Sequence, residues 1–99
     1  MTTLADVLRE VDHLDDEGLL FAAPPWDADS EAVVLVASGE LDPAAPPGLT
    51  YMLEVWLIKE VLSVWSQWRS GREPNHREAL EAVCFYARND AYIAVGKAP

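Results

Sequence analysis

The sequence predicts a single α+β domain in which helices pack on a small antiparallel or mixed sheet. The chain has 99 residues, enough for one hydrophobic core but not for two. Its composition, 51% apolar and 24% charged residues, is that of a globular protein and excludes a disordered or collagen-like chain. Three segments have a helical period and four have strand character, which predicts the order α-β-β-β-α-α-β over residues 1–99.

The first helix begins after Thr3, which forms a capping-box pattern with Asp6. Apolar residues then recur at helical spacing as far as Leu14. An acidic stretch follows, and Gly18 is expected to end the segment because glycine adopts the positive φ that stops a helix or turns the chain.

Two short apolar runs come next, and both are typical of strands. Residues 19–23 are closed by two prolines, and residues 32–37 are rich in β-branched side chains and are followed by a glycine. The polar residues 26–30 between them predict an antiparallel hairpin with a long loop. The almost continuous apolar run 33–36 indicates a strand that is covered on both faces or central in its sheet.

Residues 40–48 are expected to form a surface loop, because three prolines remove backbone donors and fix φ. The alternation in residues 49–53 predicts a third strand. From residue 55 to 69 the period is helical, and the apolar stripe is so wide that we expect burial on more than one side.

A third helix is predicted to begin at Asn75, which pairs with Glu78 in a second capping pattern. Asn89 is expected to terminate it in the left-handed conformation, and residues 91–95 are predicted to form a last strand. Cys84 lies on the inner face of this helix. Since it is the only cysteine, an internal disulfide is excluded and a buried, reduced thiol is expected.

Charge is distributed unevenly along the chain. The net charge is −10, which disfavours direct binding of nucleic acid or of anionic membranes. Residues 1–54 carry twelve acidic side chains and one basic one, whereas residues 55–99 carry five and six. Two interpretations remain open: the acidic half only aids solubility, or it forms a surface that meets a basic partner.

No pattern of catalytic or cofactor-binding residues is present, so we expect no enzyme, no cofactor and no metal. His13 has carboxylates nearby, but their spacing is not that of a zinc or calcium site. A small enzyme built on His13 is the least favoured alternative. His76 has no nucleophile at a recognisable spacing. The beginning of the chain lacks a signal-peptide pattern and no apolar run could span a membrane, so a cytoplasmic location is expected.

The four tryptophans have different predicted environments. Trp65 and Trp68 share the apolar stripe of the central helix and are expected in the core. Trp56 lies off that stripe and could anchor a partner or a homodimer. Trp26, in an acidic loop, is either an exposed contact residue or a lid folded onto the sheet.

Five short patterns along the chain support a resemblance to a known family. They are Thr3-Leu4-x-x-Val7-Leu8, Leu19-Leu20-Phe21, Val33-Val34-Leu35, Gly48-Leu49-x-Tyr51-x-Leu53 and Tyr86-x-x-Asn89-Asp90-Ala91-Tyr92-Ile93. With them the chain resembles a family of small acidic bacterial domains of unassigned function that are candidate immunity proteins of toxin–immunity systems. The resemblance implies an inhibitor that binds and neutralises a toxin.

Charge and resemblance together predict a non-enzymatic, acidic protein-binding domain, an immunity-type inhibitor of a basic effector such as a nuclease toxin. Its carboxylates would mimic the phosphates of the substrate. The expected partner-binding residues are Asp15, Asp16, Glu17, Trp26, Asp27, Asp29, Glu31, Glu40 and Asp42. Two alternatives stay open: a homodimeric structural or adaptor domain that associates through the tryptophan-rich helix, and a phage-encoded inhibitor of a nucleic-acid-processing defence system.

Overall fold

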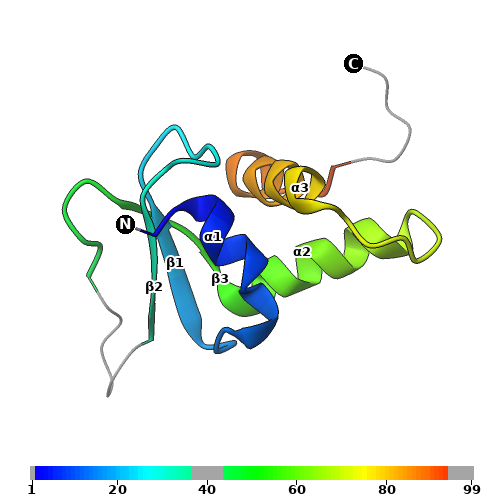
Figure 1. The fold of residues 1–99 in the computed structure, drawn as a ribbon, viewed down its shortest axis with the longest axis horizontal. Helices are drawn as coiled ribbons and strands as arrows, with labels where there is room; N and C mark the ends of the chain where they lie inside the picture. The colour runs from blue at the N-terminus through cyan, green and yellow to red at the C-terminus, as the bar shows by residue number, and fades with distance from the viewer. Residues whose placement is uncertain (1, 37–43, 94–99) are drawn as a thin grey trace.

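The computed structural model describes residues 2–36 and 44–93 of the chain (Figure 1). The elements are α1 (Leu4–Arg9), the short 3-10 helix η1 (Val11–His13), β1 (Gly18–Ala22), β2 (Ala32–Val36), β3 (Thr50–Glu54), α2 (Val55–Gln67) and α3 (His76–Asn89). The predicted α+β class is confirmed, and so is the order of the first six predicted elements. None of the helices in these ranges is long and apolar enough to cross a membrane.

The three strands form an antiparallel sheet in the order β2-β1-β3. The predicted hairpin between β1 and β2 is confirmed. The prediction that residues 33–36 are central or fully covered is wrong, because β2 is an edge strand and Val36 is 49% exposed. Val34 packs against the core while Val33 and Leu35 point to the other sheet face, so the apolar run is only half-buried on each side.

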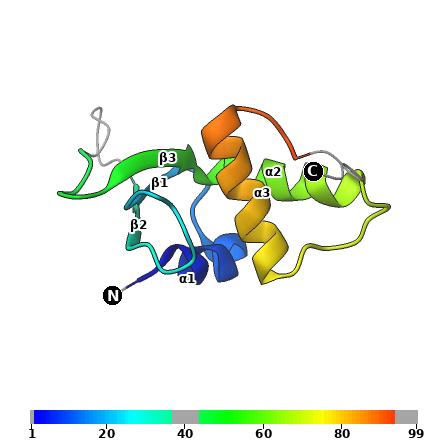
Figure 2. The same cartoon turned by 90° about the horizontal axis from the view of Figure 1, so that it is seen from above.

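The helices contact the sheet and one another and enclose the core. Figure 2 shows that α2 continues in line from β3 and that α3 crosses over it. The largest fully buried side chains come from α1, β1, α2 and α3, and they are Leu4, Leu20, Val55, Ile58, Val61 and Val83. Burying such aliphatic side chains stabilises the fold by about 1.5–3 kcal/mol each.

Both predicted capping boxes are present. The Thr3 hydroxyl accepts the Asp6 amide at 3.2 Å and the Asp6 carboxylate accepts the Thr3 amide at 3.1 Å. The first helix is shorter than predicted, because the backbone leaves helical geometry at Glu10 and tightens into η1. Val11 and Leu14 nevertheless still pack against the core.

The central helix buries only one of its three tryptophans. Trp65 is 5% exposed, whereas Trp56 and Trp68 are 50% and 48% exposed. The expectation that Trp68 lies in the core is therefore wrong: it follows the last helical residue and packs edge-on against the ring of Tyr92 at 5.8 Å. The 3.6-residue period could not show that the helix had already ended.

The end of α3 differs from the prediction by one residue, since Asp90 and not Asn89 is left-handed, with φ 54°. Residues 91–93 form no strand. Instead Tyr92 packs between Trp68 and Tyr86. The apolar residues of this segment therefore cover the ends of α2 and α3. The remainder of the predicted strand lies outside the described residues, as do residues 40–43 of the predicted loop.

Candidate functional site

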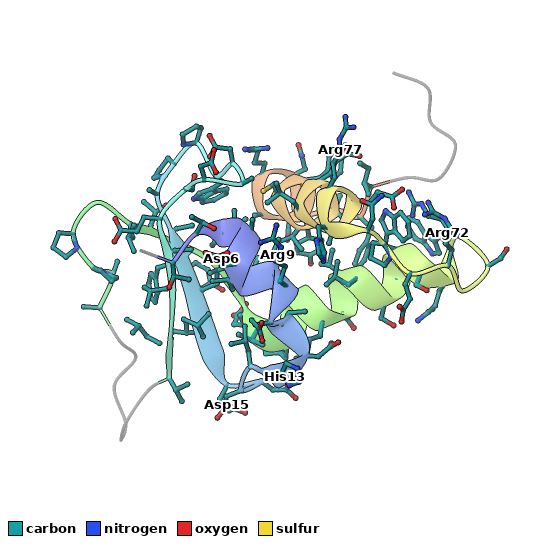
Figure 3. All side chains as sticks on the ribbon, viewed as in Figure 1. Asp6, Arg9, His13, Asp15, Arg72 and Arg77 are labelled. Carbon is teal, nitrogen blue, oxygen red and sulfur yellow. The ribbon has the colours of Figure 1, made fainter. Side chains whose placement is uncertain are left out.

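The predicted acidic surface is divided into two clusters at opposite ends of β1. Asp15, Asp16 and Glu17 form a turn before the strand, which we call the acidic turn. Residues 23–31 follow the strand and form the Trp26 loop. Figure 1 shows the acidic turn at the lower end of β1 and the loop, in cyan, at the upper end, and Figure 3 labels Asp15 in the turn. Five strand residues separate them by roughly 17 Å. Glu40 and Asp42 lie outside the described residues.

Trp26 occupies an unfavourable backbone conformation. Its φ is 66°, in the left-handed region that a bulky side chain rarely adopts. Such strain persists only where the surrounding structure fixes it, and it is concentrated at functional sites. The contacts that hold Trp26 in this conformation therefore mark its loop as a candidate site.

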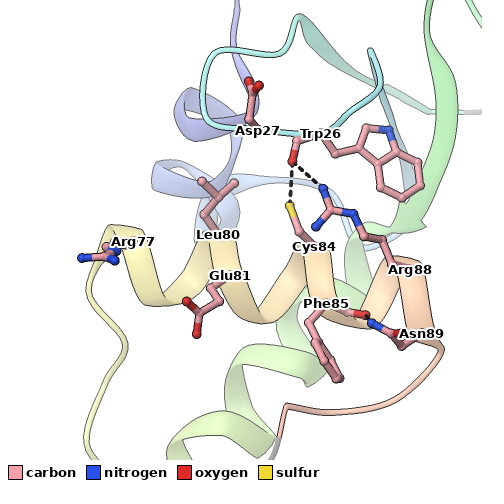
Figure 4. A pocket seen from close by; sticks show the side chains of 9 residues that line it. All are labelled: Trp26, Asp27, Arg77, Leu80, Glu81, Cys84, Phe85, Arg88 and Asn89. Carbon is pink, nitrogen blue, oxygen red and sulfur yellow. Dashed lines mark hydrogen bonds between the residues drawn. The ribbon is translucent and has the colours of Figure 1, made fainter. Parts of the chain in front are cut away.

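Helix α3 and the sheet hold Trp26 in place. Its indole Nε1 donates to the carbonyl of Ala22 at 3.1 Å, which folds the ring back over the strand end. From α3, Arg88 donates to the carbonyl of Pro25 at 2.5 Å. Arg88 and the Cys84 thiol also donate to the carbonyl of Trp26, at 3.3 and 3.2 Å (Figure 4). Of the two alternatives for Trp26, the structure shows the lid.

The rest of the Trp26 loop is also tied down. Asp27 Oδ1 accepts hydrogen bonds from the Asp29 amide at 3.1 Å and the Ser30 hydroxyl at 3.3 Å. The carbonyls of Ala28 and Ser30 accept the amides of Ala5 and Leu4, so the loop satisfies free donors in the first turn of α1. The loop therefore has a fixed shape that depends on both α1 and α3.

The carboxylates of this loop are not neutralised by a basic side chain in the part of the chain that the structure describes. Asp27, Asp29 and Glu31 are exposed, and none of them forms an ion pair with any residue that the structure describes. In the acidic turn, by contrast, Asp16 pairs with Lys59 at 2.6 Å, and the same ammonium group donates to the carbonyl of Leu14. The two clusters share a composition but differ in available charge.

A groove of about 400 Å³ lies between the Trp26 loop and α3 (Figure 4). Trp26 forms one wall, Leu80, Cys84 and Phe85 form the apolar part, and Asp27, Glu81 and Arg88 line the edges. Cys84 is buried, as expected, and forms no disulfide. Burial raises the pKa of its thiol, which makes it a poor nucleophile.

Sequence reasoning found Trp26 and Asp27 but missed the contribution of α3. Its groove-lining residues recur at helical spacing as 77-81-85 and 80-84-88, and of these only Cys84 was singled out from the sequence, as a residue of the inner face. Arg88 gave no signal, because its contacts lie 62 and 63 residues away.

The two histidines lie outside this site, both exposed, in η1 and at the start of α3. Within residues 2–36 and 44–93, no three His, Cys, Asp or Glu side chains are close enough to hold a metal ion together. The groove combines apolar surface with fixed charges at its edges, an arrangement suited to recognising another molecule.

Comparison with known proteins places the chain in a family. No curated protein and no solved structure matches the chain. The model of a family described as a domain of unknown function (DUF7716) matches residues 1–95, nearly the whole chain. The chain therefore belongs to the DUF7716 family.

Proposed function

We propose that this protein is a non-enzymatic binding domain whose Trp26 loop docks a basic protein partner. In its most specific form, the proposal is an immunity-type inhibitor of an effector such as a nuclease toxin. One observation carries it: a strained, multiply bonded loop holds three exposed carboxylates that have no ion-pair partner in the described structure.

A fixed loop favours binding for two reasons. Since the loop is already ordered by α1 and α3, little conformational entropy is lost when a partner docks. In addition, a net charge of −10 attracts a basic protein over a distance and raises the rate of association. A nuclease cleft is built to attract phosphates, so closely spaced carboxylates suit it electrostatically.

The groove beside the loop supplies apolar surface, which the exposed carboxylates do not. Binding energy is concentrated where a side chain enters a desolvated pocket surrounded by polar residues. The groove offers apolar surface from Leu80 and Phe85 next to Asp27 and Glu81. Because Arg77 and Arg88 also line the groove, we expect the partner to place an apolar side chain there and its basic residues over Asp29 and Glu31.

The homodimer alternative has less support. The exposed stripe of α2 consists of Trp56, Glu60, Ser63 and Gln67, which is polar apart from the tryptophan. Trp68 lies about 120° further round the helix axis than Trp56, so the two exposed rings do not share a face. An apolar dimer seam along α2 would need both.

The proposal is tested with two variants that lose the same amount of charge. The loop variant carries Asp27→Asn, Asp29→Asn and Glu31→Gln; the turn variant carries Asp15→Asn, Asp16→Asn and Glu17→Gln. The change Asp27→Asn keeps a side-chain oxygen that can accept the bonds inside the loop. Tagged wild type and both variants are used to capture proteins from lysate of the source organism at low and moderate salt.

We expect wild type and the turn variant to retain one basic protein and the loop variant to lose it. Equal loss in both variants would show that only net charge matters, and equal retention would exclude the loop. The retained protein is then purified and assayed for nuclease activity with and without this domain. Inhibition supports the immunity-type role, whereas capture of components of a nucleic-acid-processing defence complex supports the phage-inhibitor alternative.

A further inference from the structure

A second cavity of about 480 Å³ lies on a different part of the molecule from the Trp26 groove. Its walls come from three segments: the α1–η1 segment, α2, and the connection from α2 to the beginning of α3. The floor is apolar and is formed by Leu8, Val11, Leu62 and Ala79. The rim is polar and carries charges of both signs.

The two basic residues of the rim are already engaged with carboxylates that do not line the cavity. Arg9 lies 3.6 Å from Asp6, and Lys59 lies 2.6 Å from Asp16. Figure 3 labels Arg9 and Asp6 together on α1. Their positive charge is thus partly neutralised from outside the cavity.

The two acidic residues of the rim are not neutralised in this way. Asp12 comes from η1 and Glu73 from the α2–α3 connection, so they stand on different walls. Both are exposed, and neither forms an ion pair with a residue inside the described ranges. His76, the remaining titratable group on the rim, is exposed as well.

We propose that this cavity binds a small linear diamine, with one ammonium group at Asp12, the other at Glu73 and the aliphatic chain on the apolar floor. Each end would form a charge-assisted hydrogen bond, and the chain would displace water from Leu62 and its neighbours. A monoamine satisfies only one of the two carboxylates. The site is independent of the Trp26 loop and of the proposed protein partner.

The test is calorimetric titration of wild type with putrescine, cadaverine and hexamethylenediamine at about 0.15 M salt, where diffuse attraction to a −10 protein is screened. Pentylamine, which has the body of cadaverine but one charge, is the matched ligand control. We expect one-to-one binding of a diamine and at least about tenfold weaker binding of pentylamine. Absence of saturable binding by all three diamines would overturn the proposal.

Four single-site variants locate the site. Asp12→Asn and Glu73→Gln should each weaken diamine binding about tenfold, while Glu10→Gln, which removes an exposed charge near Asp12 but outside the cavity, should not. Ser63→Arg places a cation on the rim and should abolish binding. Near-UV circular dichroism checks that each variant is folded. Equal weakening by Glu10→Gln and Asp12→Asn would show condensation on the acidic surface and contradict a defined site.

Discussion

The acidic turn and the Trp26 loop look alike in sequence, with three carboxylates each, yet the fold treats them differently. The turn forms an ion pair with Lys59 and ties itself to α2. The loop is held by bonds from Arg88 and Cys84 to backbone carbonyls and by hydrogen bonds to Asp27 within the loop, and none of its carboxylates forms an ion pair in the described structure. The carboxylates of the Trp26 loop keep their charge because other contacts, from Arg88 and Cys84 among them, stabilise the loop.

The largest effect is expected from removing the ring that closes the loop. Trp26→Ala should lower the free energy of unfolding by about 2 kcal/mol, because a half-buried indole and its hydrogen bond to Ala22 are lost. Trp26→Gly should be at least as stable as Trp26→Ala, since only glycine is free of strain at φ 66°. Urea denaturation measures both. Trp56→Ala, on the exposed side of α2, is the control and should change stability by less than about 0.5 kcal/mol.

Arg88→Ala should lower the free energy of unfolding by a smaller amount, about 1 kcal/mol. The carbonyls of Pro25 and Trp26 lose a charged hydrogen-bond donor at a partly solvated site. Local flexibility of the two regions is the more specific measurement. Amide hydrogen exchange should accelerate in the Trp26 loop and stay unchanged in the acidic turn. Faster exchange in both regions would mean that α3 does not act on the loop specifically.

Lys59→Met removes the ion pair that holds the acidic turn. It should lower the free energy of unfolding by less than about 1 kcal/mol, because the ion pair with Asp16 is largely exposed. Exchange should now accelerate in the acidic turn only, and the destabilisation should shrink as salt is added. If Lys59→Met loosens the Trp26 loop as well, the two regions are coupled and the contrast between them fails.

The smallest effect concerns the carboxylate of Glu78, which belongs to the first turn of α3 and to neither of the two regions. Hydrogen bonds from Arg72, with the Asn75 amide, lower the pKa of Glu78 from 4.5 to about 2. A lowered folded pKa stabilises the native state above pH 4.5, and this contribution is lost as the pH falls toward 2. Thermal unfolding of wild type and Glu78→Gln should therefore differ at about pH 6 and converge near pH 2. A constant difference across this range would contradict the assignment.

Most of the fold was readable from the sequence because it depends on local chemistry. The capping residues Thr3 and Asn75 marked two helix starts, and the apolar runs marked three strands. The errors concern long-range geometry: the edge position of β2, the exposure of Trp68 and the packing role of Tyr92 depend on partners far along the chain.

The same limit applies to the candidate site. Composition identified acidic residues and Trp26, but not their division between two ends of the sheet, which follows from the direction of β1. The sequence around Lys59 does not indicate that this residue neutralises the acidic turn. The sequence around Arg88 does not indicate that this residue positions the Trp26 loop. These roles depend on contacts across 43 residues for Lys59 and on 62 and 63 for Arg88.

The most direct test of the central claim is to map where a partner touches. Once a basic protein has been captured, isotope-labelled domain is titrated with it and backbone amide shifts are followed. If the Trp26 loop docks the partner, perturbations will concentrate in residues 26–31 and on the groove face of α3, around Leu80 and Phe85. Perturbations centred on residues 15–17, with the Trp26 loop unchanged, would contradict the proposal.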